Sequence, residues 1–271
     1  MKKVSCLGPA GSYSCLAVQK LCKDAAIVPC RNFGEAFQKL LSGEVETAVV
    51  PVENSIQGGV LEVLDLLERE KVFAVERLVL PIDHRLAIKA GTSLSQIKKV
   101  YSHEQAIGQC SEFLQANLPN ADYLPTRSTA ESLLMVDDTS AGIVGAHANR
   151  EGVVLSNENI ANEKHNFTQF FRLVREEKGL PLHGEYLFFC AVCAHKPGSL
   201  LDLLRIFADS GLNLTKIESR PIRDVYGEYR FYIEVEGDYA DENMQRAIAL
   251  AKENCRQFRI IGVYGKSKTE T

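Results

Sequence analysis

Short apolar runs alternate with amphipathic helical patterns over about the first 175 residues of the chain. The pattern predicts strands such as Lys3–Leu7, Thr47–Val52 and Val100–Ser102, and helices such as Ser14–Lys23 and Glu104–Asn117. Repeated strand–helix–strand order is typical of mostly parallel, doubly wound α/β sheets, and we expect two of them here. Ligands of such sheets bind outside the carboxyl ends of the strands, which is where candidate chemistry is sought.

A second unit follows a polar segment with Gly and Pro at 176–184, which is typical of a linker. A strand is predicted at Tyr186–Ala194 and a helix at Ser199–Ser210, followed by two strands, a helix and a last strand that ends at Val263. This βαββαβ order is ferredoxin-like. The tail from Gly265 to Thr271 is expected to be unstructured.

Composition narrows the class of protein. The 271 residues correspond to about two domains at roughly 150 residues each. With 31 basic and 35 acidic residues the chain carries a net charge of −4, which argues against nucleic-acid binding. No apolar run reaches the roughly 18–20 residues that span a bilayer, and the first run ends at Gly8, too early for a secretory signal. We therefore expect a soluble, cytoplasmic protein without a membrane partner.

Eight cysteines in a chain of this length do not indicate a disulfide scaffold. Cys190 and Cys193 lie three apart on a predicted strand, so their sulfurs point to opposite faces and cannot hold one zinc ion. Phosphate-binding and dinucleotide-binding loops are also missing from the sequence. The sequence predicts neither a metal site nor a cofactor.

Four polar clusters follow predicted strands. They are Gly8–Ser14, Pro51–Gly59, Ser102–Glu104 with Gln109, and Asn166–Leu173. The first offers backbone N–H groups at a helix start, and His103 at another helix start is expected to be neutral. Each cluster alone also has an ordinary structural explanation. The first fits a turn before a helix, the second a polar loop, the third a structural histidine and the fourth a threonine that fills a strand position. Together they predict a small-molecule site in a cleft between two lobes.

Taken in order, these clusters resemble the prephenate dehydratase family. The matching elements are Gly8–Ser14, Pro51–Ser55, Ser102 and His103 with Gln109, Ser128–Ala130, and an Asn-x-Thr-x-Phe element at Asn166–Phe170. The C-terminal unit resembles the regulatory ACT domain, whose two phenylalanine-binding signatures match Pro197–Leu201 and Asn213–Pro221.

The resemblance implies a fold and a division of the chain. Two doubly wound βα lobes would enclose a central cleft, as in type II periplasmic binding proteins, and a ferredoxin-like ACT domain would follow. The catalytic domain would span 1–177, with lobe one at about 1–80 and 160–177 and lobe two at about 81–159; the ACT domain would span 185–265. No chorismate mutase segment precedes Lys3, so a monofunctional form is expected.

The implied reaction converts prephenate to phenylpyruvate with loss of CO2 and water, and the gain of aromaticity makes an electron-sink cofactor unnecessary. The resemblance assigns protonation of the leaving hydroxyl to Thr168, and our hypothesis adds Glu53 or His103 as its neighbour in a proton relay. The residues expected to bind the substrate are Gly8, Pro9, Gly11, Ser12, Asn54, Ser55, Ser102, Gln109 and Phe170.

The ACT resemblance implies feedback inhibition, in which L-phenylalanine binds an inactive arrangement more tightly, and a homodimer or homotetramer. The residues expected to form its allosteric site are Gly198, Ser199, Leu200, Leu201, Asn213, Leu214, Thr215, Glu218, Ser219 and Arg220. Glu218 and Arg220 share one strand face and are expected to form an ion pair.

One position departs from the family pattern, because Gln169 stands where the family has Arg. On a strand, Thr168 and Phe170 share one face and residue 169 points to the other, so the family's Arg is expected to serve a lobe contact or a buried pair. We expect activity to be retained, with Arg127, Lys164 or Arg172 as alternative sources of positive charge. Two alternatives stay open: an arogenate dehydratase, or a catalytically silent phenylalanine-binding sensor.

Overall fold

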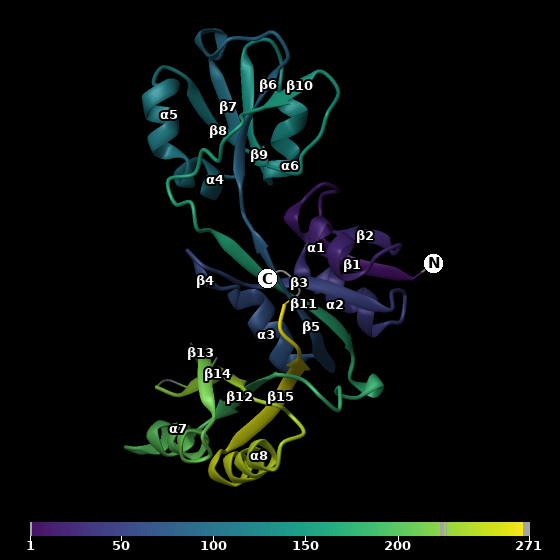
Figure 1. Cartoon of the computed structure of the whole chain (residues 1–271), viewed down its shortest axis with the longest axis vertical. Helices are drawn as coiled ribbons and strands as arrows, with labels where there is room; N and C mark the ends of the chain where they lie inside the picture. Colours follow the sequence, from purple (N-terminus) through teal and green to yellow (C-terminus); the bar gives the residue numbers. More distant parts are fainter. Residues whose placement is uncertain (1, 223–224, 226, 268–271) are drawn as a thin grey trace.

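The computed structural model describes residues 2–222, 225 and 227–267, and Figure 1 shows three units arranged along its long axis. Lobe one, in the middle, consists of β1 (Lys3–Leu7), α1 (Tyr13–Leu21), β2 (Ala26–Cys30), α2 (Phe33–Leu41), β3 (Thr47–Asn54), β4 (Gly58–Gly59), α3 (Leu61–Arg69), β5 (Val72–Pro81) and β11 (Phe167–Arg175). The short 3-10 helix η3 (Glu176–Lys178) leads out of it.

Lobe two lies at the top of Figure 1. It consists of β6 (His84–Lys89), η1 (Leu94–Gln96), β7 (Lys99–Ser102), α4 (Glu104–Gln109), α5 (Ser111–Asn117), β8 (Asp122–Pro125), α6 (Thr129–Ser132), η2 (Leu133–Met135), β9 (Ser140–Gly145) and β10 (Val153–Leu155). Two chain segments connect the lobes, residues 82–83 and residues 156–166. Lobe two is therefore an insertion between two strands of lobe one.

The C-terminal unit consists of β12 (Tyr186–Val192), α7 (Ser199–Asp209), β13 (Asn213–Pro221), β14 (Tyr229–Glu236), α8 (Glu242–Asn254) and β15 (Gln257–Tyr264). Its strand order β13-β14-β12-β15 and its element order confirm the predicted ferredoxin-like βαββαβ unit. The prediction for Cys190 and Cys193 is also confirmed, since Cys190 packs in the core shared with lobe one and Cys193 in the core under the helices.

The two α/β lobes are confirmed, but their sheets are mixed rather than mostly parallel. In lobe one β1 pairs in parallel with β2 and β3, whereas β11 runs antiparallel to both β3 and β5. In lobe two β7 is parallel to β8 and β9, while β6 is antiparallel to β9 and β10. The antiparallel strands in lobe one arise because β11 enters the sheet from the opposite direction, after the chain has returned from lobe two.

Local predictions failed where a single residue broke the pattern. Strand β2 was not predicted because it contains Pro29; it lies at the edge of the sheet, where a proline is tolerated. The predicted helix Glu104–Asn117 divides into α4 and α5 at Cys110. The start of the tail is ordered, because Ser267 is buried and accepts a hydrogen bond from the backbone N–H of Val79 (3.1 Å); residues 268–271 lie outside the described residues.

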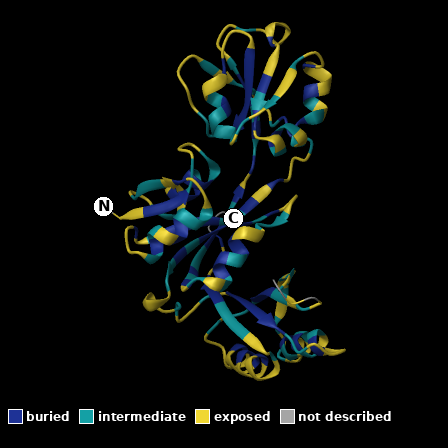
Figure 2. Cartoon of the chain, turned by 180° about the vertical axis from the view of Figure 1, so that it is seen from behind, coloured by how far each residue is buried: buried dark blue, intermediate teal, exposed yellow. Residues whose placement is uncertain are grey.

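The C-terminal unit shares a hydrophobic core with lobe one. One face of its sheet is covered by α7 and α8, and the other packs on lobe one, where Phe188, Tyr232 and Tyr264 meet Leu64 and Phe171. The two units also share one sheet, since β15 pairs with β5 at Gly262 and Ala74. A Cβ atom at Gly262 would lie 2.6 Å from the Ala74 carbonyl oxygen, so only glycine permits this approach. The buried strands, dark blue in Figure 2, run through both units.

A buried ion pair lies in this interface. The Arg77 Nη1 atom on β5 is 3.4 Å from Oε1 of Glu234 on β14, and both side chains are 6% exposed. The Glu234 carboxylate also accepts hydrogen bonds from the Tyr264 hydroxyl (2.6 Å) and the Thr215 hydroxyl (2.6 Å). The Arg77 guanidinium stacks over the Tyr186 ring at 4.0 Å. Charge and aromatic contacts therefore hold the two units in one orientation.

No helix among the described residues is long and apolar enough to cross a membrane.

We expect Arg77→Leu to lower the free energy of unfolding by about 3–5 kcal/mol, because it leaves the Glu234 carboxylate buried without its cation. Urea denaturation followed by circular dichroism measures the loss. Arg31→Leu is the matched control, since Arg31 pairs with Glu35 at the surface, where such pairs contribute about 0–1 kcal/mol. Equal, small losses in the two variants would contradict a structural role for the buried pair.

Candidate active site

A cavity of about 270 Å³ lies between lobes one and two, slightly below the roughly 300–1,000 Å³ of typical small-molecule sites. Lobe one contributes the first residues of α1 and the facing ends of β3 and β11, and lobe two contributes the first residues of α4 and α6. The lining residues are Leu7, Gly8, Ser12, Tyr13, Ser14, Pro51, Asn54, Ile82, His84, His103, Gln105, Ala106, Gln109, Arg127, Ser128, Thr129, Asn166, Thr168 and Phe170.

Asn54 and Thr168 form the lobe-one floor of this cavity. They are register partners on β3 and β11, and both side chains are buried. The Asn54 Nδ2 atom donates to Thr168 Oγ1 (3.0 Å) and to Asn166 Oδ1 (2.8 Å). Its Oδ1 atom accepts from the backbone N–H groups of Ile56 (3.1 Å) and Gln57 (3.2 Å). Because backbone N–H groups can only donate, the orientation of the Asn54 carboxamide is fixed. Thr168 Oγ1 is therefore an acceptor toward Asn54, and its own proton is available to a group in the cavity.

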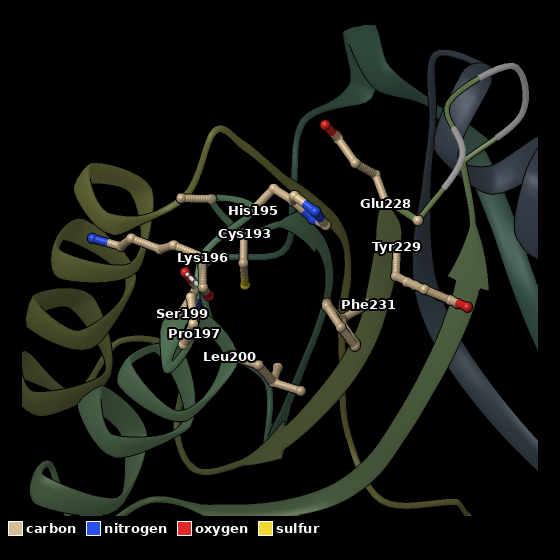
Figure 3. Close-up of a pocket in the computed structure, with 11 residues that line it drawn as sticks. Cys193, His195, Lys196, Pro197, Ser199, Leu200, Glu228, Tyr229 and Phe231 are labelled. Carbon is tan, nitrogen blue, oxygen red and sulfur yellow. Dashed lines mark hydrogen bonds between the residues drawn. The ribbon is translucent and has the colours of Figure 1, made fainter.

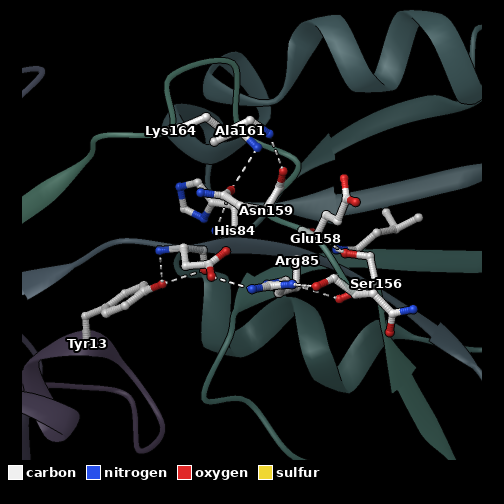
Figure 4. A network of polar contacts seen from close by, with 11 residues as sticks. Tyr13, His84, Arg85, Ser156, Glu158, Asn159, Ala161 and Lys164 are labelled. Atoms are coloured by element: carbon white, nitrogen blue, oxygen red, sulfur yellow. Dashed lines mark hydrogen bonds and ion pairs between the residues drawn. The ribbon is translucent and has the colours of Figure 1, made fainter.

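The polar contacts continue from lobe one into lobe two. Asn166 Nδ2 donates to Gln109 Oε1 (3.4 Å), and the same Gln109 oxygen lies 2.9 Å from His84 Nε2. His84 is buried, and its burial lowers the pKa of the imidazole, which the hydrogen bond to Gln109 partly opposes. Figure 4 shows His84 beside Asn159, whose side chain accepts a hydrogen bond from the His84 backbone N–H (3.2 Å).

Tyr13 and His147 hold the lobes together beside the cavity. The Tyr13 hydroxyl donates to the Asp83 carbonyl (2.8 Å) and accepts from the Asp83 N–H (3.0 Å), and in Figure 4 its ring reaches across from lobe one. His147 Nε2 contacts the carbonyl oxygen of Gly11 (2.9 Å), and its ring meets the Tyr13 ring edge-on at 4.7 Å. Burial raises the pKa of Tyr13 to about 12, so the phenol stays protonated and keeps donating to the connection.

Three helix starts face the cavity. Ser12 caps α1: its hydroxyl accepts from the Cys15 N–H (3.4 Å) and donates to the Leu7 carbonyl (3.0 Å). His103 caps α4, and its Nδ1 atom accepts from the Gln105 N–H (3.3 Å). Arg127 precedes α6 and pairs with Glu131 (2.8 Å) while remaining largely exposed. Backbone N–H groups and one guanidinium, itself paired with Glu131, are therefore the groups at this cavity that suit an anion.

Seven of the twelve predicted catalytic and substrate-binding residues line this cavity: Gly8, Ser12, Asn54, His103, Gln109, Thr168 and Phe170. Glu53 does not line it. Successive residues of β3 point to opposite faces, and the Glu53 carboxylate pairs with Nζ of Lys216 on β13 (2.8 Å). The same alternation explains why Gln169 does not line the cavity, although Thr168 and Phe170 on either side of it do. Gln169 is the register partner of Glu53.

The remaining predicted substrate-binding residues support the cavity from outside. Ser102 is fully buried and donates to the Ile143 carbonyl (2.8 Å). The Ser55 hydroxyl accepts from the Phe167 N–H (3.0 Å) and so fixes the start of β11. Pro9 and Gly11 belong to the turn before α1, where Gly11 has φ of +82° and its carbonyl contacts His147. These four residues do not line the cavity, and the contacts described here hold its framework.

Sequence reasoning missed His84 and gave Tyr13 no separate role. Both residues form hydrogen bonds at the connection between the lobes, Tyr13 with Asp83 and His84 with Gln109. These contacts join residues far apart in the sequence, so no local pattern reveals them. The one signal was the polar pair Asp83-His84 between two apolar strands.

A second cavity of about 290 Å³ lies in the C-terminal unit (Figure 3). Ser199 and Leu200, at the start of α7, face Tyr229 and Phe231 of β14 across it. Residues 193–197 and Gly227–Glu228 complete the lining, so the cavity includes two of the predicted allosteric residues. Gly198 precedes α7 in a left-handed conformation (φ +86°).

The other predicted allosteric residues lie on α7 or on β13, the edge strand of the sheet. Leu201 on α7 and Ser219 on β13 are exposed. A shift in register after Leu214 turns the side chains of Lys216, Glu218 and Arg220 toward lobe one. The expected Glu218–Arg220 ion pair is wrong, because Arg220 instead pairs with Asp65 of α3 (3.1 Å).

Comparison with known proteins gives one consistent result. The family model described as "Prephenate dehydratase" matches residues 4–178, and the model "ACT domain" matches 189–248. A "Bifunctional chorismate mutase/prephenate dehydratase" of Neisseria gonorrhoeae is 34% identical over 96% of this chain and 74% of its own length. An "Arogenate dehydratase/prephenate dehydratase 1" of Arabidopsis thaliana is 33% identical over 97% of this chain and 71% of its own. The crystal structure of a prephenate dehydratase of Arthrobacter aurescens in complex with L-Phe is similar with a TM-score of 0.88, 30% identity, and coverage of 99% and 91%.

Because Ser102 supports β9 and does not face the cavity, we expect Ser102→Ala to lower stability without changing catalysis. Loss of its buried hydrogen bond should lower the free energy of unfolding by about 0.5–1.5 kcal/mol, because the Ile143 carbonyl still accepts from the Ser132 hydroxyl (2.8 Å). The steady-state parameters of the reaction that its relatives catalyse should stay within about twofold of the wild type. A change in KM of more than about tenfold would instead indicate that Ser102 contacts the ligand.

Proposed function

Since the chain belongs to the prephenate dehydratase family, we propose that the cavity between its lobes binds prephenate and that Thr168 protonates the departing hydroxyl group. The protein is a hydro-lyase of phenylalanine biosynthesis. We assign catalysis to residues 1–177 and regulation to residues 185–265. The observation that carries the catalytic assignment is the hydrogen bond from Asn54 to Thr168, which leaves the threonine proton directed to the ligand.

The reaction balances without an electron acceptor. The bond between the ring and its carboxylate breaks, CO2 leaves, and the electron pair enters the ring. The C–O bond at the opposite ring carbon breaks, and the hydroxyl leaves with one added proton as water. Because the ring becomes aromatic, the enzyme needs to align the substrate and deliver one proton.

Thr168 is suited to deliver that proton through its surroundings. An aliphatic hydroxyl is a weak acid, but a hydrogen bond donated to its oxygen by Asn54 stabilises negative charge that develops there. The proton moves to the leaving oxygen as the C–O bond lengthens, and solvent returns a proton to Thr168 afterwards. His103 lines the cavity, and we propose that it passes this proton from solvent to Thr168. Glu53 pairs with Lys216 and takes no part in our proposal.

Prephenate carries two carboxylates, and the cavity offers two places for them. The start of α1, a nine-residue helix, presents the backbone N–H groups of Tyr13 and Ser14, whereas the Ser12 N–H donates to the Pro9 carbonyl (3.2 Å). Arg127 with Ser128 and Thr129 forms a second, cationic side in lobe two. Binding the two carboxylates to different lobes would favour closure of the lobes around the substrate and exclusion of water.

The test of this function is the steady-state conversion of prephenate to phenylpyruvate, followed by ultraviolet absorbance. We expect Thr168→Ala to lower kcat by about 10²–10⁴-fold with little change in KM, because a positioned acid contributes in that range. Thr168→Ser keeps the hydroxyl and should retain most of the activity. A Thr168→Ala protein that turns over at the wild-type rate would remove the assignment, and arogenate in the same assay tests the second activity named for the Arabidopsis relative.

We propose that L-phenylalanine binds at the cavity of the C-terminal unit and inhibits the enzyme. The cavity has aromatic walls in Tyr229 and Phe231 and charged neighbours in Lys196 and Glu228, which suit the side chain and the two charges of an aromatic amino acid. The relative from Arthrobacter aurescens was solved with L-Phe. We further propose a homodimer or homotetramer, supported by the unpaired edge of β13 and the exposed apolar side chains Leu201 and Ile217.

Lys216 offers a route from that cavity to the active site. Lys216 lies on β13 and forms an ion pair with Glu53 of β3. The residue after Glu53 is Asn54, which donates a hydrogen bond to Thr168. Lys216 is 10% exposed and Glu53 is 34% exposed, so the pair is partly shielded from water and a shift of β13 would weaken it. Movement of β13 on ligand binding would therefore change the position of the end of β3.

We expect Lys216→Met to raise the concentration of L-phenylalanine needed for half inhibition at least about fivefold, at the lower end of allosteric couplings. Dose–response curves of prephenate turnover measure it. Arg230→Met is the matched control, because Arg230 pairs with Glu68 of α3 (2.9 Å) in the same interface but far along the chain from Asn54. If both variants lost inhibition equally, the interface as a whole, and not the Lys216–Glu53 contact, would carry the signal.

A further inference from the structure

We infer that His84 is a positioning residue of the dehydratase reaction, which holds its proton on Nε2 and thereby fixes the Gln109 carboxamide at the far end of the set of amides that begins at Thr168. The inference rests on the proposed role of Thr168. It starts from a continuous set of contacts that links Thr168 in lobe one to His84 at the connection between the lobes.

The direction of each hydrogen bond in this set follows from the one before it. Backbone N–H groups of Ile56 and Gln57 donate to Asn54 Oδ1, so its nitrogen is the donor toward Asn166 Oδ1. Asn166 then presents its own nitrogen to Gln109, so the Gln109 atom in contact with it is the oxygen. That oxygen also faces His84 Nε2 at 2.9 Å, and an oxygen can only accept. His84 therefore carries its proton on Nε2, and Nδ1 holds a lone pair.

Two polar atoms at the end of this set have no hydrogen-bond partner among the residues that the structure describes. They are His84 Nδ1, an acceptor, and Gln109 Nε2, a donor. Both residues line the cavity, and the His84 side chain is nearly fully buried there. An unpartnered buried polar atom is costly in a folded protein and is found mainly where a ligand or a reaction uses it. His84, at 2.9 Å, makes the shorter of the two contacts to the Gln109 oxygen, and this contact helps to hold the Gln109 amide nitrogen ready to donate to the substrate.

His84 is also fixed from outside the cavity. Its backbone N–H donates to Asn159 Oδ1 (3.2 Å), and its carbonyl accepts from the Ile160 N–H (2.9 Å), so both chain connections between the lobes meet at this residue. The carboxylate of Asp83, the residue before it, pairs with Arg85 (2.5 Å) and acts on the imidazole through its charge, which opposes part of the lowering of the His84 pKa by burial. His84 consequently couples the relative placement of the lobes to the orientation of the Gln109 carboxamide.

The experiment compares two substitutions in the full-length enzyme. In His84→Gln the side-chain nitrogen can replace Nε2 as the donor to Gln109, whereas in His84→Asn the amide is too short to reach it. We expect His84→Asn to lower kcat/KM for prephenate about tenfold or more, and His84→Gln to recover most of that loss. His183→Gln, an exposed histidine in the segment before β12, is the control and should match the wild type.

Two further measurements separate positioning from simple stabilisation. In a double-mutant cycle, His84→Asn should have little effect in a Thr168→Ala background, because both changes act on the same proton delivery. In ¹⁵N-histidine NMR of the unliganded protein, His84, assigned by its absence in His84→Gln, should show a protonated Nε2 and an unprotonated Nδ1.

A proton on Nδ1, equal losses in the two variants, or full additivity in the cycle would each overturn the inference. The NMR result does not depend on turnover, so it stands even if Thr168→Ala proves fully active. Failure of the proposed function and failure of the His84 inference are therefore distinguishable.

Discussion

Strand β11 enters the sheet of lobe one between β3 and β5 and pairs antiparallel with both, after the chain has returned from lobe two. This insertion places Thr168 opposite Asn54, at the edge of the sheet that faces lobe two. It also brings Asn166 and the connection between the lobes to the same point. The cavity between the lobes has this form because one strand closes the sheet and brings the Thr168 hydroxyl, our proposed acid, into the cleft.

Fixed amide orientations then determine the chemistry. Backbone N–H groups fix the orientation of the Asn54 carboxamide. The hydrogen bonds that follow then determine which atom donates and which accepts at Thr168, Asn166 and Gln109. Neutral amides suit this site, since a charged residue beside Thr168 would repel or trap one of the substrate's carboxylates. The alternation of strand faces separates this neutral network from the ion pairs on the far side of β3, where Glu53 meets Lys216.

The sequence motifs predicted the architecture well, because apolar periodicity reports which elements exist and motif order reports the family. Asn54, Gln109 and Thr168 were found in this way. Their neighbours in sequence were not separated correctly: Glu53 and Ser55 flank Asn54, yet period-two geometry turns them away from the cavity. His84, Asn166 and Gln109 meet only through tertiary packing, and a linear pattern holds no information on such a contact. The same alternation did predict correctly that Gln169 would face away from Thr168 and Phe170.

The shared core of lobe one and the C-terminal unit limits how this enzyme can be released from end-product control. Leu64 and Phe171 pack against Phe188, Tyr232 and Tyr264, so cutting the chain near residue 178 would expose a broad apolar surface on the half that remains. We therefore expect a shortened chain to lose stability unless these core positions are also changed. If L-phenylalanine inhibits the enzyme as we propose, variants that escape it are expected from single replacements that keep the C-terminal unit in place.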